Sequence, residues 1–116
     1  MRHARTVLAV AAVALQMVVL YAPSGPDMGD VGLPVDKVVH VAVFALATWA
    51  LAAAGMSPGW SVALMAAHAP ISELVQHLVL PDRSGDPADV VADLLGVALG
   101  AGLAGRTVRR VPARPR

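Results

Sequence analysis

The chain alternates between long apolar stretches and short polar ones. Four stretches are apolar enough to predict helices, at residues 6–22, 37–54, 60–80 and 88–104. A helix that spans a bilayer needs roughly 17–25 mainly apolar residues, and each stretch falls in that range. The pattern therefore predicts an all-α fold, a bundle of four transmembrane helices joined by short loops.

The segments between these stretches are rich in residues that end helices. Residues 23–34 combine proline, glycine and aspartate, while 55–59 and 81–87 are short and contain glycine and proline. Such clusters are typical of loops and tight turns. Pro70 lies inside the third stretch, and because proline removes one helical hydrogen bond, we expect a bend there.

Composition supports a membrane protein. Of the 116 residues, 57% are hydrophobic and 15% are charged, whereas soluble domains carry roughly 25% charged residues. A soluble chain this short has too much surface to bury so many apolar side chains. The sequence contains no cysteine, which excludes disulfides and thiolate metal sites.

The first apolar stretch has an alternative interpretation. A basic start followed by an apolar run also fits a cleaved signal peptide. The run is long for such a segment, however, and Leu20-Tyr21-Ala22 is a poor cleavage site followed by Pro23. A retained first span is the preferred prediction.

Positive charge is concentrated near the two ends of the chain. Seven arginines lie there, whereas Lys37 and Arg83 are the only cations between the first and last helices. Because positive residues favour the cytoplasmic side, both termini of this multi-pass protein are predicted to be cytoplasmic in the bacterial cell membrane. The predicted organisation is a cytoplasmic N-terminus at 1–5, a transmembrane domain at 6–105 and a basic cytoplasmic tail at 106–116.

The same topology places the acidic residues at the outer ends of the helices. Helical spacing also puts several polar residues on common faces, since positions three or four apart are neighbours. The polar residues expected to meet at the outer leaflet are Asp36, Lys37, His40, Glu73, Gln76, His77, Arg83, Asp86, Asp89 and Asp93. Charged groups in lipid are costly and should face the bundle interior and pair there. The acids outnumber the two permanent cations, so some carboxylate is expected to be protonated, hydrogen-bonded or waiting for a ligand.

Two glycines continue the polar stripe of the fourth helix. Asp89, Asp93, Gly96 and Gly100 follow one another by four, three and four residues. A GxxxG pair predicts close helix packing, either within the bundle or in a homo-oligomer.

At these positions the chain resembles the VanZ-like family of small bacterial membrane proteins. The resemblance covers residues 36 to about 104 and rests on three motifs: Asp36-Lys37-x-x-His40 with Phe44, Glu73-x-x-Gln76, and Arg83-x-x-Asp86-x-x-Asp89-x-x-x-Asp93-x-x-Gly96. The family usually has asparagine where this chain has Asp93. The resemblance implies a protein of the cell envelope and a link to glycopeptide resistance of the teicoplanin type, but it implies no settled reaction.

Several functions fit the polar residues. The preferred one is binding of a lipid or lipid-linked anionic group at the outer leaflet, with a phosphate or carboxylate meeting Lys37 and Arg83. The predicted ligand-binding residues are Asp36, Lys37, His40, Glu73, Gln76, Arg83, Asp86, Asp89 and Asp93. An alternative is an enzyme acting on a lipid phosphate, with Glu73, His40 and Asp89 as candidate catalytic residues. No hydrolase, transferase or phosphate-loop motif is present, so catalysis stays open.

Two further possibilities complete the predictions. The polar residues could act only as hydrogen-bonding and ionic contacts that hold the helices together. A zinc site formed by His40, Glu73 and His77 is chemically adequate but lacks a second typical ligand pair, so no metal or other cofactor is predicted. The expected partners are membrane lipids, not nucleic acid.

Overall fold

The computed structural model describes residues 2–22, 35–80 and 86–109. These residues form four α-helices: α1 (Arg2–Tyr21), α2 (Val35–Ala53), α3 (Pro58–Val79) and α4 (Pro87–Arg109). No strand occurs in this part of the chain. All four helices are long and apolar enough to cross a membrane. The predicted all-α bundle of four candidate spans is therefore confirmed.

The helices differ from the predicted spans mainly at the end of the bundle that holds the chain termini. α1 begins at Arg2 rather than at residue 6, and Thr6 Oγ1 donates a hydrogen bond to the Arg2 carbonyl. α4 continues to Arg109, beyond the predicted end at residue 104. The helix therefore extends over residues 106–109 of the segment that the sequence analysis assigned to the basic tail. Arginine is a good helix former, and no glycine or proline follows Gly105 until Pro112.

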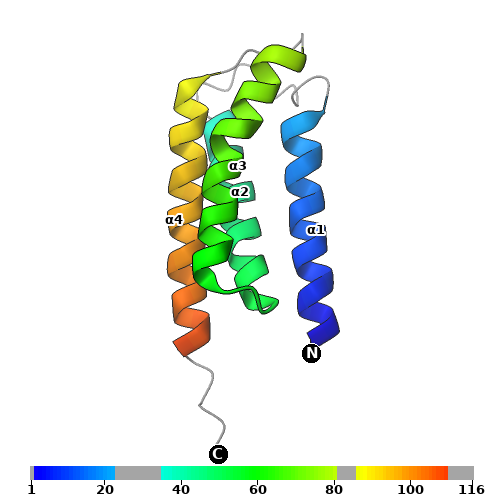
Figure 1. Cartoon of the computed structure of the whole chain (residues 1–116), viewed down its shortest axis with the longest axis vertical. Coiled ribbons are helices and arrows are strands. Elements are labelled where there is room, and N and C mark those ends of the chain that lie inside the picture. The colour runs from blue at the N-terminus through cyan, green and yellow to red at the C-terminus, as the bar shows by residue number, and fades with distance from the viewer. Residues whose placement is uncertain (1, 23–34, 81–85, 110–116) are drawn as a thin grey trace, which may run out of the picture.

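Successive helices run in opposite directions along the bundle. Figure 1 shows that the start of α1 and the end of α4 lie at the same end of the molecule, while the start of α2, the end of α3 and the start of α4 lie at the other. This is the arrangement expected for an even number of spans. The side of the membrane that each end faces stays a prediction.

The closest helix pair is α2 with α4, two spans that are not consecutive in the chain. A Cβ atom added at Gly96 would lie 2.9 Å from the Phe44 Cβ, and one added at Gly100 would lie 2.8 Å from the Thr48 Cβ. Both glycines are thus required for close packing against α2. Of the two predicted uses of the GxxxG pair, packing within the bundle is present, and the homo-oligomer stays a prediction.

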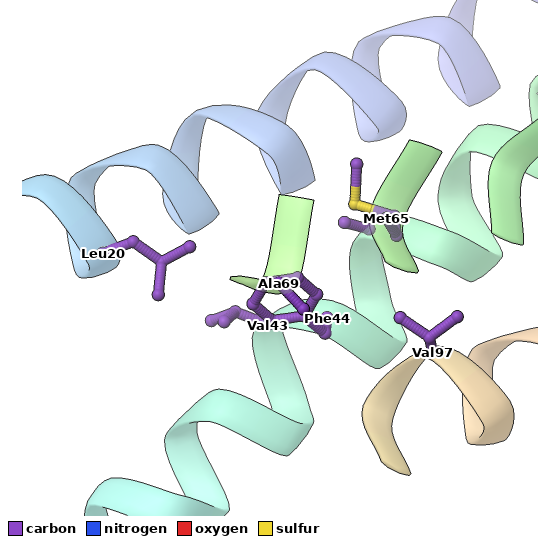
Figure 2. Close-up of a cluster of buried hydrophobic side chains, with 7 residues drawn as sticks. Leu20, Val43, Phe44, Met65, Ala69 and Val97 are labelled. Carbon is purple, nitrogen blue, oxygen red and sulfur yellow. The ribbon is translucent and has the colours of Figure 1, made fainter. Parts of the chain in front are cut away.

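The buried core lies between all four helices. Figure 2 shows side chains from the four helices converging around Phe44 of α2, which is fully buried. The cluster consists of Leu20, Val43, Phe44, Ala47, Met65, Ala69 and Val97. Because α1 contributes the fully buried Leu20, it is an integral part of the bundle.

The outer surface of the bundle is apolar as well. Large hydrophobic side chains such as Val10, Val18, Leu74 and Leu99 are exposed on the sides of the helices. Apolar patches of this extent are unusual on soluble monomers and mark surfaces that contact another apolar phase. They fit a protein surrounded by lipid.

The turn between α2 and α3 follows from its residues. Gly55 has φ +114°, a conformation that other residues rarely adopt, and Met56 N–H donates to the Leu51 carbonyl to close the end of α2. Ser57 then caps α3 by accepting a hydrogen bond from Trp60 N–H at 3.2 Å.

Pro70 lies inside α3 without interrupting it, and in Figure 1 the upper part of α3 changes direction.

Candidate functional site

A polar cluster occupies the end of the bundle opposite the chain termini. It draws residues from the start of α2, the later part of α3 and the start of α4. Its members among the described residues are Asp36, Lys37, His40, Glu73, Asp86, Asp89 and Asp93. Seven of the nine residues predicted to bind a ligand are thus brought together.

Lys37 forms the more exposed half of the cluster. Its ammonium donates a hydrogen bond to Asp86 Oδ2 at 2.7 Å and another to Asp89 Oδ1, and Asp36 Oδ2 lies 3.7 Å away. The contact with Lys37 is the largest cause that lowers the pKa of Asp86 below its usual 3.8, and the Ala88 N–H, which donates to Asp86, lowers it further. These bonds fix the lysine at the mouth of the bundle, with 32% of its side chain exposed.

His40 and Asp93 form the buried half. His40 Nδ1 lies 2.6 Å from Asp93 Oδ1, and both residues are almost completely buried. The other ring nitrogen, Nε2, faces the carboxylates of Asp89 at 3.6 Å and Asp36 at 3.8 Å. The aspartate that stands where the VanZ-like pattern usually has asparagine is therefore a direct partner of His40.

Glu73 connects α3 to the start of α4. Its Oε1 atom accepts a hydrogen bond from the Asp86 N–H, which satisfies one of the free backbone donors at the beginning of that helix. Its Oε2 atom is buried and has no hydrogen-bond partner in the part of the chain that the structure describes, and the same is true of Asp93 Oδ2. Within residues 2–22, 35–80 and 86–109, two buried carboxylate oxygens of the cluster thus have no hydrogen-bond partner.

Two apolar grooves open beside the cluster. One, of about 460 Å³, runs between α2 and α4 from Lys37 along side chains that include Val41, Val91 and Leu95. The other, of about 360 Å³, lies between α3 and α4 and is lined by Glu73 and His77 among others. Both grooves lie where a bilayer would contact the bundle.

Two of the predicted residues that the structure describes, Gln76 and His77, lie outside the cluster. Gln76 is buried and donates a hydrogen bond to the Leu20 carbonyl at 2.7 Å, so it joins α3 to the end of α1. His77 is exposed on α3 and lines the groove there. Arg83, the second predicted cation, lies outside the described residues.

Three polar residues within the bundle, Tyr21, His68 and Gln16, form contacts outside the polar cluster that were not predicted from the sequence. Tyr21 Oη lies 2.8 Å from His68 Nε2, which joins α1 to α3. Gln16 is fully buried and its Nε2 donates to Met65 Sδ at 3.5 Å. Their position as isolated polar residues inside apolar stretches was visible in the sequence, but the identity of their partners depends on how the helices are rotated.

No family model, no curated protein and no solved structure matches the chain. The geometry of the polar cluster therefore carries the functional argument, and the resemblance to the VanZ-like family stays a prediction.

Proposed function

We propose that this chain is a VanZ-like protein of the cell envelope that binds a lipid or lipid-linked molecule carrying an anionic phosphate headgroup. The polar cluster would meet the headgroup, and an apolar groove would hold the hydrocarbon chain. A role in resistance to teicoplanin-type glycopeptides would follow if the bound molecule is a lipid-linked precursor of the cell wall.

The observation that carries the proposal is the position of Lys37 at one end of the apolar groove between α2 and α4. A groove lined by Val38, Val41, Val91 and Leu95 offers an alkyl chain the same environment as lipid, next to a cation that can contact a phosphate. The combination of an apolar channel and a cation at its polar end matches the two halves of an anionic lipid.

The hydrogen bonds of Lys37 leave it able to bind. A lysine ammonium has three N–H donors, and among the described residues only Asp86 and Asp89 accept hydrogen bonds from it. Asp36 at 3.7 Å is an ionic neighbour beyond hydrogen-bond distance. One donor is therefore available for a headgroup oxygen, while the two aspartates hold the side chain in place.

Native mass spectrometry of the gently solubilised protein tests this proposal. We expect a phosphate-bearing lipid to remain bound to the wild type and to be lost in Lys37→Gln, whereas Lys37→Arg retains it. Arg106→Gln is the matched control, because it removes a cation at the opposite end of the bundle. Because Arg83 is predicted from the sequence to contact the same headgroup, Arg83→Ala should lose the lipid as well.

A second variant tests the groove without disturbing the ion pairs. Ala88 is exposed and lines the groove, so Ala88→Leu should obstruct the hydrocarbon chain and weaken lipid retention. Equal retention by wild type, Lys37→Gln and Ala88→Leu would contradict lipid binding at this site. It would favour the alternative that the cluster only holds the helices together.

The His40–Asp93 pair supports an enzyme as a second candidate function. A carboxylate within hydrogen-bond distance of one imidazole nitrogen orients the ring and favours proton transfer at the other nitrogen. The reaction would be cleavage or transfer of a lipid phosphate near His40, Glu73 and Asp89. Turnover of a labelled polyprenyl phosphate that disappears in Glu73→Gln would establish it, and no turnover across a panel of lipid phosphates would remove it.

A further inference from the structure

The polar cluster has more carboxylate groups than cations to pair with them. Among the described residues, the cluster holds five carboxylates but only one lysine and one histidine. Glu73 and Asp93 are only 7% and 0% exposed, and one oxygen of each has no hydrogen-bond partner among the described residues. Buried charged oxygens are stable only when paired, hydrogen-bonded or bound to a metal.

The unpartnered oxygens belong to residues that can share one ion. One ring nitrogen of His40 and one carboxylate oxygen each of Glu73 and Asp93 lie within 4.8 Å of one another. Ligands at about 2.0–2.2 Å from a zinc ion lie about 3.3 Å apart, so small side-chain rotations bring all three onto one ion. The three residues come from three different helices, which fixes their relative positions through the packing of the bundle.

We propose that His40, Glu73 and Asp93 form a binding site for a divalent transition-metal ion, Zn²⁺ or Mn²⁺. One imidazole and two carboxylates suit these ions, because imidazole favours zinc and carboxylate oxygens favour manganese. Three protein ligands also leave a coordination position open for an outside group. The zinc set considered from the sequence, with His77, is replaced by one in which Asp93 is the third ligand.

The surroundings of His40 match those of a metal ligand. A metal-bound histidine commonly donates its second ring N–H to a carboxylate, which orients the ring and selects the tautomer. With Nδ1, which lies beside Asp93, as the ligand atom, Nε2 would carry the ring proton, and it faces Asp89 at 3.6 Å and Asp36 at 3.8 Å. The contact of 2.6 Å between His40 Nδ1 and Asp93 Oδ1 marks a place where a cation can replace a shared proton.

A second group of three donors is the weaker site. Asp36, His40 and Asp89 also lie within 4.8 Å of one another. Asp36 is exposed, however, and Asp89 is already engaged by the Lys37 ammonium. The set with unpartnered buried oxygens is therefore the one that an ion would occupy.

The metal site deepens the lipid-binding proposal, and only this last step rests on that proposal. A phosphate approaching Lys37 would meet several carboxylates, which repel it. A divalent ion offsets two of these negative charges, and its open position can accept a phosphate oxygen. The groove of about 360 Å³ between α3 and α4, which Glu73 lines, provides access from the lipid side.

Metal titration of the full chain in detergent, without added phospholipid, tests the site. After removal of metals with a chelator, we expect the wild type to bind one Mn²⁺ per chain, detected by electron paramagnetic resonance, and Zn²⁺ to displace it. Glu73→Gln and Asp93→Asn should each bind about 10-fold or more weakly. His77→Gln, which changes an exposed histidine on the same helix, is the matched control and should bind as the wild type does.

Two measurements keep the test decisive if a variant misfolds. Circular dichroism establishes whether each variant keeps its helices, and the electron spin echo of Mn²⁺ bound to wild type should show coupling to an imidazole nitrogen. Absence of stoichiometric binding by the wild type overturns the proposal, as does equal binding by a folded Glu73→Gln variant. Mn²⁺ bound without nitrogen coupling also overturns it, because the ion then lies elsewhere.

The metal-site proposal and the lipid-binding proposal can be disproved independently of each other. Lipid retention that depends on Lys37 but survives chelation would remove the metal site and leave the lipid proposal standing. Metal binding by His40, Glu73 and Asp93 with no retained lipid in any variant would establish the ion site and remove the lipid function.

Discussion

At the level of single residues, the polar cluster contains two kinds of contact, one exposed and one buried. Lys37 and Asp86 form an ion pair that remains in contact with water, whereas His40 and Asp93 are enclosed by the bundle. Exposed pairs are screened and contribute little to stability, while the loss of one partner from a buried pair is strongly destabilising. Substitutions in the two halves should therefore have very different effects.

The pH dependence of stability tests the Lys37–Asp86 ion pair. Because the folded protein lowers the pKa of Asp86 below its usual 3.8, the stabilisation is fully present above pH 3.8 and is lost as the pH falls through the lower, folded value. Thermal unfolding in detergent should show wild type more stable than Asp86→Asn at pH 7, and this difference should shrink toward pH 3. A difference that stays constant over this range would contradict the assignment.

The sequence predicted most of the cluster because its spacing follows from helix geometry. Asp36 and His40 lie four residues apart, and so do Asp89 and Asp93, so each pair had to lie on one helix face. The sequence could not show which residues of the two faces pair with each other, nor that Gln76 would turn toward the Leu20 carbonyl instead of the cluster. Those outcomes depend on the rotation and vertical position of each helix in the bundle.

At the scale of helices, the contact between α2 and α4 determines the alignment of the polar cluster. Lys37 lies opposite Asp89, His40 opposite Asp93, and Thr48 opposite Gly100. The pairs advance in the same direction along both helices, so the two helices run parallel with a constant alignment. A shift of one helical turn would replace these pairs with others, because Asp86, Asp89 and Asp93 are three and four residues apart and a different carboxylate would then lie opposite Lys37 and His40.

Glycine substitutions test this alignment. A methyl group at Gly96 would collide with Phe44 and the backbone of α2, so Gly96→Ala should destabilise the bundle by about 1–3 kcal/mol. Gly102→Ala adds a methyl group where no atom lies within 4 Å. It should stabilise the helix by about 1 kcal/mol. Thermal unfolding in detergent should move in opposite directions for the two variants, and a gain in stability for Gly96→Ala would contradict the packing described above.

Helix boundaries were predicted well where a residue ends the helix and poorly where none does. Gly55 ends α2 near the predicted position because its positive φ closes the helix. At the start of α1 and the end of α4, the boundaries predicted from hydropathy stopped next to the first charged residues. Arg5 and Arg106 are nevertheless good helix formers, so the helices continue through them. Hydropathy measures the span that lipid requires, and the helix extends beyond it.

For the whole molecule, the topology predicts which surface faces the cytoplasm. The chain has no cysteine, so single cysteines can be introduced without background labelling. In spheroplasts, an impermeant thiol reagent should label Val79→Cys, at the end of α3 near the polar cluster. Gly59→Cys, at the opposite end of that helix, should be labelled only after lysis. The reverse pattern would place the polar cluster on the cytoplasmic side.

The pairing of α2 with α4 also sets the order in which the protein can be assembled. His40 and Asp93 are separated by 53 residues. Because ribosomes add about 5–20 residues per second, Asp93 is synthesised about 3–10 s after His40. During that interval α1 and α3 are the only helices available to shield the polar start of α2. A chain whose synthesis stops before α4 therefore carries a lysine and a histidine in the membrane without their α4 partners, a defect that membrane quality-control proteases can recognise.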